Sequence, residues 1–495
     1  MATPNTSEIL VGYEAELSAT APRSLKFRFA KDVLVFGWAN VFSLVLNGTL
    51  AFLLPRYLAI EDFGYYRLFI LYTSLAGSVH LGFLEGILVR WAEKPDERVG
   101  PEIKSALAFL LVQHCAILLP ACVALVLWTR TPHYVWLGLG IAVFFVVFNG
   151  SMIGQIGLQT RKQFGQLSFF TVVTSALLFV FVVACKLLGR LSSSTAIASY
   201  VAANLVAALF IWRVALKPGA APVRPFQDAK RLGLDNIHLG WKILLANLLL
   251  TVIPNLDRFF VSGAFSIQDF AIYAFAGNAL AVVYTVSISV SRVVYPYLSE
   301  GTSAAARSRA YNLGQRAIVS LWALSLTLYF PIAYLVHWIL PRYLDSLPIV
   351  RLLMINFAFV CMIYVLHANY FRVNLALNRF LTGSVVGVVA AALLLALARH
   401  AANLQWIAAA MTGAIMIWWT ANEVLLAPRV GGSWADRSRI LVLWLLNSVV
   451  FLLASSIRSL WLGGLVYTLA CIILLAGGLR KSIAPLLARS LVVSR

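Results

Sequence analysis

Long apolar runs recur from one end of the sequence to the other. A helix needs about 20 apolar residues to cross a bilayer, and only helices and closed barrels satisfy their backbone polar groups there. With 61% hydrophobic and 12% charged residues, the chain differs sharply from a soluble protein. The sequence predicts an all-α polytopic membrane protein with about 14 transmembrane helices, at 31–55, 66–89, 103–128, 134–156, 167–188, 195–213, 240–265, 271–297, 313–339, 347–371, 380–397, 404–426, 440–457 and 460–479.

Basic residues are distributed unevenly between the two sides of these predicted spans. If residues 1–30 form a cytosolic tail, 28 of the 39 Lys and Arg residues lie on the cytosolic side and 9 on the outer side. Positive charge favours the cytosolic side, so both termini are expected there, the second as a tail at 480–495. The net charge of +20 is therefore attributed to topology, and no nucleic-acid partner is expected.

No pattern in the sequence indicates an enzyme. The five cysteines lie in apolar runs without metal-ligand spacing, and the chain contains neither a Walker-type phosphate loop nor a GxSxG motif. We therefore expect no catalytic residues, no cofactor and no metal site.

The chain contains an internal repeat. IEDFGYY at 60–66 and IQDFAIY at 267–273 are identical at four of seven positions, at an offset of 207 at which Asn40 also aligns with Asn247. The repeat predicts two six-helix lobes, at 31–213 and 240–426, joined by a basic cytosolic linker at 214–239. A C-terminal helix pair is expected at 440–479, outside the repeat. Asp62 and Asp269, in the two turns, are expected to cap the helices that follow.

The principal candidate site is the seventh apolar run, which contains Asp257 and Arg258 and is interrupted by Pro254. A charge at the centre of a span costs roughly 3 kcal/mol, so such charges usually face a cavity or a partner. Arginine binds phosphate through its fork of donors, whereas the alternative is an arginine that extends to the membrane surface. Four polar residues recur at helical spacing on one face of this run: Asn247, Thr251, Asn255 and Arg258.

Three further groups are candidates. Arg292, which shares one helical face with Asn278, is expected either to bind substrate or to extend to the cytosolic interface. Asn40 and Asn47 are expected to line the cavity from the first lobe. The second run offers an ion-coupling site or a buried ion pair, made of His80, Glu85 and Arg90. A stripe that either contacts glycan or links two helices comprises His367, Tyr370, Asn374 and Asn378.

The hairpins LLPRYLAIEDFGYYRLFILYTSLAGSVHLGFLEGILVRW and NLDRFFVSGAFSIQDFAIYAF resemble the polysaccharide transporter family of oligosaccharide flippases. Its superfamily also includes the multidrug and toxin extruders and the lipid II flippase. The resemblance implies two six-helix lobes around a central cavity, and alternating access. It also implies movement of a polyprenyl-pyrophosphate-linked oligosaccharide from the inner to the outer leaflet of the bacterial inner membrane, for surface polysaccharide synthesis.

The resemblance implies as partners this lipid-linked glycan, membrane lipids, and a polymerase or glycosyltransferases of the same pathway. The alternative is an ion-coupled drug or metabolite exporter of the same superfamily. Exporters of cationic drugs favour carboxylates inside the membrane, so the arginines in the polar stripes disfavour cationic cargo. A glycan polymerase or ligase is disfavoured by the short predicted outer loops, such as 129–133 and 189–194.

Overall fold

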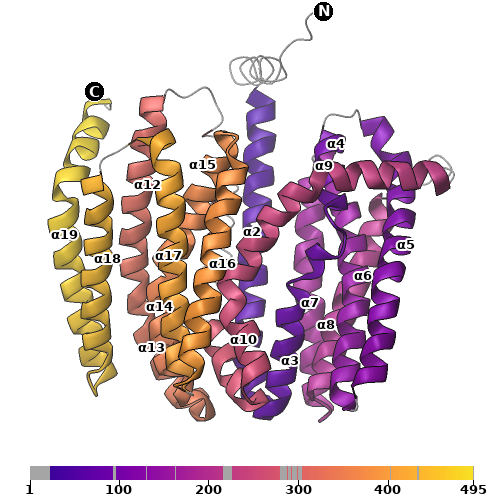
Figure 1. Ribbon diagram of the computed structural model, residues 1–495, viewed down its shortest axis with the longest axis horizontal. Coiled ribbons are helices and arrows are strands. Elements are labelled where there is room, and N and C mark those ends of the chain that lie inside the picture. Colours follow the sequence, from indigo (N-terminus) through magenta and orange to yellow (C-terminus); the bar gives the residue numbers. More distant parts are fainter. Residues whose placement is uncertain are drawn as a thin grey trace, which may run out of the picture. The chain divides into compact units, whose positions relative to one another are not determined.

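The computed structural model describes residues 23–92, 96–129, 131–161, 163–215, 226–278, 287, 291, 298, 304–401, 403–431 and 434–493. These residues form helices and short connections, with no strand among them (Figure 1). The chain divides into two compact units, Met1–Ala274 (unit 1) and Phe275–Arg495 (unit 2). The predicted all-α class is confirmed in the described part of the chain.

In unit 1, the first six predicted apolar runs correspond to seven α-helices, α2 to α8, because the second run is split into α3 and α4, and a further broken helix follows the seventh run. Their bounds are α2 (Arg23–Tyr57), α3 (Ile60–Thr73), η1 (Ala76–Ser78), α4 (Phe83–Ala92), α5 (Asp96–Trp128), α6 (Pro132–Thr160), α7 (Phe164–Leu187), α8 (Ser193–Ala215), α9 (Phe226–Val252), η2 (Ile253–Asn255) and α10 (Leu256–Ala264). Residues 267–278 are again helical.

In unit 2, helices follow the ninth to fourteenth predicted runs. Their bounds are α12 (Ala304–Ser325), η3 (Leu326–Leu328), α13 (Tyr329–Ile339), η4 (Pro341–Ser346), α14 (Leu347–Met362), η5 (Ile363–His367), α15 (Ala368–Val373), α16 (Leu377–Arg399), α17 (Leu404–Val430), α18 (Trp434–Ser455) and α19 (Leu460–Val493). Helices α16 and α17 pack along each other, and so do α18 and α19 (Figure 1).

By length and composition, ten helices in the described residues can cross a membrane, or eleven when the bent pair of α3–η1 and α4 counts as one span. Two shorter apolar helices, Val41–Tyr57 and Leu460–Ala476, overlap the first and last predicted runs. The eighth predicted run, 271–297, is described continuously only to residue 278. The predicted number of about 14 is therefore approximate.

The burial of the spans differs widely. In the apolar part of α5 only 11% of residues are buried, whereas in the span from η4 to α15 the buried share is 78%. A helix that exposes apolar side chains along most of its length is suited to contact with lipid. The span centred on α14 forms the core of unit 2.

Unit 1 has an apolar core where α4 packs against α5 and α6. Phe83 and Trp91 of α4 meet Phe109 of α5 and Ile153 of α6, and all four are buried. Helix α9 also packs along α4 (Figure 1). This contact needs glycine, because a Cβ on Gly86 would overlap the backbone of Asn236 in α9. The start of α4 is therefore held close to α9.

The two repeated turns meet within unit 1. Gln268 donates a hydrogen bond of 2.8 Å to Glu61, and these two residues are equivalent at the repeat offset of 207. Asp269 forms a reciprocal capping box with Ser266, accepting from its backbone N–H and hydroxyl and donating its own N–H to that hydroxyl. Asp62 instead accepts from the N–H of Ser193, the first residue of α8. Asp269 therefore caps its own helix, whereas Asp62 caps a different one.

Helices extend into segments that the sequence assigned to a linker and to tails. Residues 226–239, within the predicted linker, form the first half of α9, while 216–225 lie outside the described residues. Helix α2 begins at residue 23 and α19 continues to residue 493. A basic helical segment next to a span has the same excess of Lys and Arg as a cytosolic loop. Hydropathy alone therefore ends each predicted helix where the apolar run ends, before the helix itself does.

Candidate functional site

The predicted polar stripe of the seventh run is a chain of hydrogen bonds across a broken helix. Arg258 donates from Nη1 to the Asn255 side-chain oxygen at 2.7 Å. Asn255 donates to the Thr251 carbonyl at 2.8 Å, and Thr251 donates to the Asn247 carbonyl at 3.0 Å. Pro254 lies in the 3-10 turn η2 between α9 and α10, where a proline interrupts regular helical bonding. The spacing along one helical face thus becomes a connected polar track.

Asp257 has a different environment from its neighbour Arg258. Its side chain is buried and accepts from the Tyr273 hydroxyl at 2.7 Å and from the Arg258 backbone N–H at 2.8 Å. The carboxylate thereby links the start of α10 to the helix at 267–278. The Arg258 guanidinium donates to Asn255, and the Asp257 carboxylate orients the backbone at the start of α10.

Arg67 in α3 belongs to the same region, and it was not among the candidates from the sequence, although it lies at the start of the second predicted span, 66–89. It lies within electrostatic range of Arg258 and of the hydroxyls of Tyr66 and Tyr200. Its Nε atom is buried and has no hydrogen-bond partner among the described residues. A signal was present in the sequence, because Arg67 is an ionisable residue inside an apolar run. Two arginines of like charge near one another form a natural binding site for an anion.

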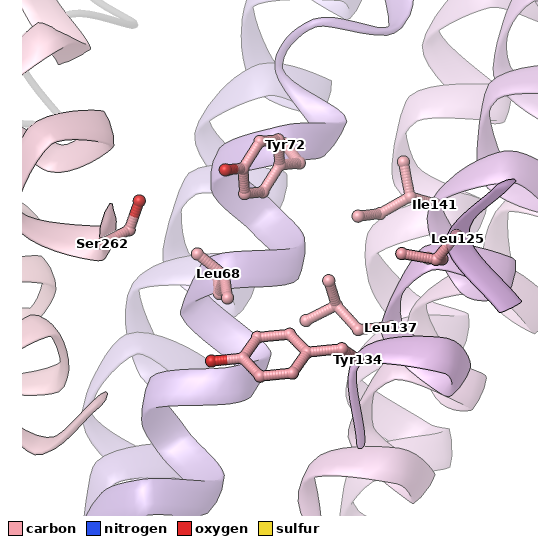
Figure 2. A pocket seen from close by; sticks show the side chains of 8 residues that line it. Leu68, Tyr72, Leu125, Tyr134, Leu137, Ile141 and Ser262 are labelled. Carbon is pink, nitrogen blue, oxygen red and sulfur yellow. The ribbon is translucent and has the colours of Figure 1, made fainter. Parts of the chain in front are cut away.

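A cavity of about 280 Å³ is lined by residues that neighbour these arginines along the chain. Leu68 and Tyr72 of α3, one and five residues after Arg67, line it, and so does Ser262, one helical turn after Arg258. Figure 2 shows Ser262 on one side and Leu137 of α6 on the other, with Leu68 and Tyr72 between them. The lining is mostly apolar. Unit 1 therefore places an apolar cavity with a few hydroxyls beside the arginine pair.

The two first-lobe asparagines, Asn40 and Asn47, lie on α2. Asn47 is exposed and donates to the Ser175 hydroxyl of α7 at 3.3 Å, while Ser43 donates to the Thr171 carbonyl of α7 at 3.2 Å. The face that carries Ser43 and Asn47 therefore packs α2 against α7. The side chain of Asn40 lies outside the described residues.

The second run bends sharply and brings three polar residues together. His80 Nδ1 lies 3.5 Å from Glu85 Oε2, and the amide of Asn247 in α9 hydrogen-bonds to the same carboxyl group. In the described part of the chain Glu85 contacts these two residues and not Arg90. Arg90 instead lines a small cavity with Trp91, five residues beyond Glu85 on α4. Asn247 thus joins the polar track of Arg258 to the Glu85 site.

Unit 2 contains a buried ionic cluster around Glu423 of α17, which the sequence analysis did not identify. Arg437 of α18 donates from Nε to Glu423 Oε2 at 3.0 Å. The other carboxylate oxygen accepts from Tyr311 at 2.5 Å and from Gln315, both on α12. His367 Nε2 lies 3.0 Å from the Tyr311 hydroxyl and 3.3 Å from Glu423 Oε1. An acid inside an apolar run was the available signal.

The predicted stripe from His367 to Asn378 does not lie on one continuous helix. His367 ends the π-helical turn η5, and α15 ends at Val373, after which Leu375 takes a left-handed φ of 50°. His367 and Tyr370 are fully buried, and Tyr370 donates to the Arg307 carbonyl at 2.8 Å. These two residues link helices in the interior of unit 2, as expected for a stripe that joins two helices and does not contact glycan.

The other members of this stripe, and Arg292, are placed as follows. Asn374 caps α15 and donates to the Tyr370 carbonyl at 2.8 Å, while its own carbonyl accepts from Arg429. Asn378 is exposed on α16. Arg292 lies outside the described residues. The structure therefore brings His367 and Tyr370 together but separates them from Asn378.

Comparison with solved structures shows a shared fold. The lipid II flippase MurJ in an inward closed conformation aligns over 91% of this chain and 100% of its own, with a TM-score of 0.64 and 12% sequence identity. A MATE transporter of Vibrio cholerae aligns over 82% of this chain and 99% of its own, with a TM-score of 0.51 and 14% identity. An outward-facing multidrug resistance MATE family transporter of the MOP superfamily aligns over 83% of this chain and 96% of its own, with a TM-score of 0.50 and 14% identity.

No curated protein matches the chain in sequence. Residues 29–302, which are more than half of the chain, match the family described as "Polysaccharide biosynthesis protein". The helices long enough to span a membrane and the fold shared with MurJ agree with this match. The chain is therefore a multi-pass membrane protein that belongs to the polysaccharide biosynthesis protein family.

Proposed function

We propose that this protein is a flippase that moves a polyprenyl-pyrophosphate-linked oligosaccharide from the inner to the outer leaflet of the bacterial inner membrane. It works by alternating access, with both termini in the cytosol, and supplies surface polysaccharide synthesis. Family membership and the fold shared with a lipid II flippase support a lipid-linked glycan as cargo. The observation that carries the proposal is the pair Arg67 and Arg258, two arginines within electrostatic range of each other in unit 1.

The chemistry of the cargo explains why arginines are needed. A diphosphate is the charged part of a lipid-linked sugar, and removing it from water requires opposite charge and donors. Each guanidinium carries five N–H donors in a fixed plane that match phosphate oxygens. Asn255 holds one of the Arg258 donors at 2.7 Å and so orients the fork. The apolar cavity beside Leu68 and Tyr72 gives the first carbons of the lipid a place next to the diphosphate.

An exporter of cationic drugs on the same fold is less well supported. It would need a carboxylate that is available to a cation. Asp257 is engaged by Tyr273, and Glu423 by Arg437 and three further side chains. Asp257 and Glu423 are thus engaged by the protein's own side chains, whereas Arg67 and Arg258 bring two like positive charges into range of each other.

The proposal places the protein between two classes of reaction. Glycosyltransferases that build the lipid-linked oligosaccharide must supply the cargo, and a polymerase or transferase on the outer side must consume it. The flippase itself makes and breaks no covalent bond. Contact with those enzymes is part of the proposal and rests on this order of steps.

The test is substitution of the arginine pair in a strain that lacks the native protein. Arg258→Ala removes a charge-assisted hydrogen bond worth about 2 kcal/mol, so surface glycan should fall by roughly 30-fold at equal protein level in the membrane. Arg67→Ala should act in the same direction. Arg258→Lys keeps the charge and loses the fork, so it should retain an intermediate level.

The matched control is Arg342→Ala, which removes an exposed arginine from η4 in unit 2 and should leave surface glycan unchanged. Purified protein should also bind farnesyl diphosphate in preference to farnesol, and Arg258→Ala should lose that preference. Normal glycan display by Arg258→Ala at normal protein level would exclude the diphosphate assignment.

A further inference from the structure

The second predicted span is broken at a defined place in unit 1. Residues Ile60–Ser78 and Phe83–Trp91 form two helical segments that meet at 53°. Between them Leu81 and Gly82 have left-handed φ angles of 53° and 93°. A Cβ on Gly82 would come within 2.6 Å of the backbone N of Trp241 in α9, so the break is packed tightly against that helix. Non-glycine residues in this backbone region are costly and cluster at functional sites.

The break brings two proton acceptors face to face. His80 Nδ1 accepts the backbone N–H of Gly82 at 3.2 Å, so its lone pair is already in use. The same atom lies 3.5 Å from Glu85 Oε2, an oxygen that is buried and has no hydrogen-bond partner among the described residues. Side-chain exposure is 4% for His80 and 16% for Glu85. Two unprotonated acceptors at this distance repel, whereas one proton between them makes the contact favourable.

Among the described residues, no cation on the neighbouring helices balances Glu85. Helix α9 contributes the neutral amide of Asn247, and its nearest basic residue, Lys242, is exposed over the ring of Trp241. On α4 itself, Arg90 lies more than one turn beyond Glu85. An isolated carboxylate among apolar helices is disfavoured by several kcal/mol relative to its neutral form.

Helices α5 and α6 contribute a neutral pair. His114 of α5 is close enough to His80 to interact with it electrostatically. Its Nδ1 lies 2.9 Å from the Leu110 carbonyl and its Nε2 lies 2.9 Å from the Asn149 amide of α6. The neutral tautomer satisfies both contacts, since Nδ1–H donates to the carbonyl and Nε2 accepts from the amide. Among the described residues of these two helices, no other charged side chain acts on Glu85.

The donor set favours a proton over a metal ion. Hard cations such as Ca²⁺ and Mg²⁺ take about six oxygen ligands. Here one carboxyl group, one amide and one imidazole converge, and the described residues contain no cluster of three His, Cys, Asp or Glu side chains that could hold a metal.

We propose that Glu85 and His80, with Asn247 as a positioning residue, form a proton-binding site at the break of the second span, and that proton binding drives transport. Protonation converts a net charge of −1 at the site to zero and exchanges the bond from Gly82 N–H to His80 Nδ1 for a hydrogen bond across the break, between His80 Nδ1 and Glu85 in the first turn of α4. Deprotonation reverses both changes. One proton is taken from one side of the membrane and released unchanged to the other, and no bond of the cargo is altered.

The proton-binding part is tested on the purified full-length protein by infrared difference spectroscopy between acidic and alkaline pH. A band of a protonated carboxyl group should be present in the wild type and absent in Glu85→Gln. It should persist in the control Glu102→Gln, whose carboxyl group accepts a hydrogen bond of 2.9 Å from Trp91. A band of unchanged intensity in Glu85→Gln would overturn the site, and so would a band that responds to Na⁺ and not to pH.

If Glu85→Gln does not insert, His80→Gln provides the readout. Coupled groups share a proton, so loss of the imidazole should move the midpoint of the carboxyl titration by at least about one pH unit, a tenfold change in proton affinity. An unmoved midpoint would show that the two side chains do not share the site.

The coupling part rests on the proposed function and is tested in cells. Collapse of the pH gradient, with the membrane potential maintained, should lower surface glycan about tenfold in the wild type. Glu85→Gln should be insensitive to that collapse. Wild-type display that ignores the gradient would overturn the coupling but leave the flippase standing. A wild-type protein that supports no glycan display under any gradient would overturn the proposed function, while the infrared result would remain valid.

Discussion

Glu85 in unit 1 and Glu423 in unit 2 are both glutamates enclosed by helices, but their surroundings are opposite. Glu423 has an arginine, a tyrosine hydroxyl and an amide as donors, with a histidine nearby. Glu85 has one amide and faces an imidazole nitrogen that is already an acceptor. A fully compensated carboxylate stays ionised and fixes its neighbours, whereas an uncompensated one can take up and release a proton.

The local backbone differs in the same way. Glu423 lies inside the continuous helix α17, and its partners come from α12, η5 and α18, so the cluster ties four segments of unit 2 together. Glu85 lies in the first turn of α4, directly after a break that carries two left-handed residues. The cluster in unit 2 therefore has a structural role, whereas the site in unit 1 is suited to a change of protonation state.

The largest loss of stability is expected when Arg437, the cation paired with Glu423, is removed. Arg437→Ala leaves a buried carboxylate without its ion-pair partner, so the free energy of unfolding in detergent should fall by about 3–5 kcal/mol. Arg90→Ala, the basic residue nearest to Glu85 on α4, should cost less than about 1 kcal/mol because no ion pair is lost. Thermal unfolding of both variants measures the difference. An equal loss in the two would mean that Glu85 also depends on a cation.

The next effect tests the backbone of the two regions. Gly82→Ala places a Cβ against α9 at a φ of 93°, and strain plus overpacking should lower stability by about 3 kcal/mol. Gly431, whose carbonyl accepts from Arg437 beside the Glu423 cluster, has a φ of 71°, but a Cβ there would meet only the Ser308 hydroxyl, at 3.7 Å. Gly431→Ala should therefore cost only about 1 kcal/mol. Denaturation midpoints measure both losses of stability. Equal losses for Gly82→Ala and Gly431→Ala would mean that the break at Gly82 is not tightly packed against α9.

The smallest effect is expected at Glu85 itself. Glu85→Gln resembles the protonated carboxyl group in shape and charge, so the free energy of unfolding at neutral pH should change by less than about 1 kcal/mol. Glu423→Gln should cost several times more, because it leaves Arg437 buried without a counter-charge. Unfolding curves of the two variants are measured side by side. A lower stability of Glu85→Gln than of Glu423→Gln would contradict the comparison.

The sequence was informative where structure depends on local patterns. Runs of about 20 apolar residues predicted the helices, and Pro254 predicted the break between α9 and α10. The helical spacing of Asn247, Thr251, Asn255 and Arg258 predicted one polar face, and these residues do form one chain of hydrogen bonds. Such features survive because they involve residues within a few turns of each other.

The sequence was less informative about partners. Arg90, five residues from Glu85, was the natural candidate for an ion pair, but the structure gives Glu85 the amide of Asn247 instead. Arg67, at the start of the second predicted span, was not among the candidates, although it lies within electrostatic range of Arg258. In both cases the decisive neighbour comes from a helix far away in sequence, and hydrophobic periodicity contains no information about which faces of distant helices meet.

By itself, the sequence determined that the chain crosses a membrane many times as helices, that its turns repeat, and that arginine lies within an apolar run. These follow from the cost of exposing backbone and charge to hydrocarbon, which acts on every short segment separately. Only the tertiary structure decided that Glu423 is neutralised by Arg437 while Glu85 is left facing His80. The reason is that the state of a buried charge depends on the few side chains packed around it, and packing assembles these from helices that are remote along the chain.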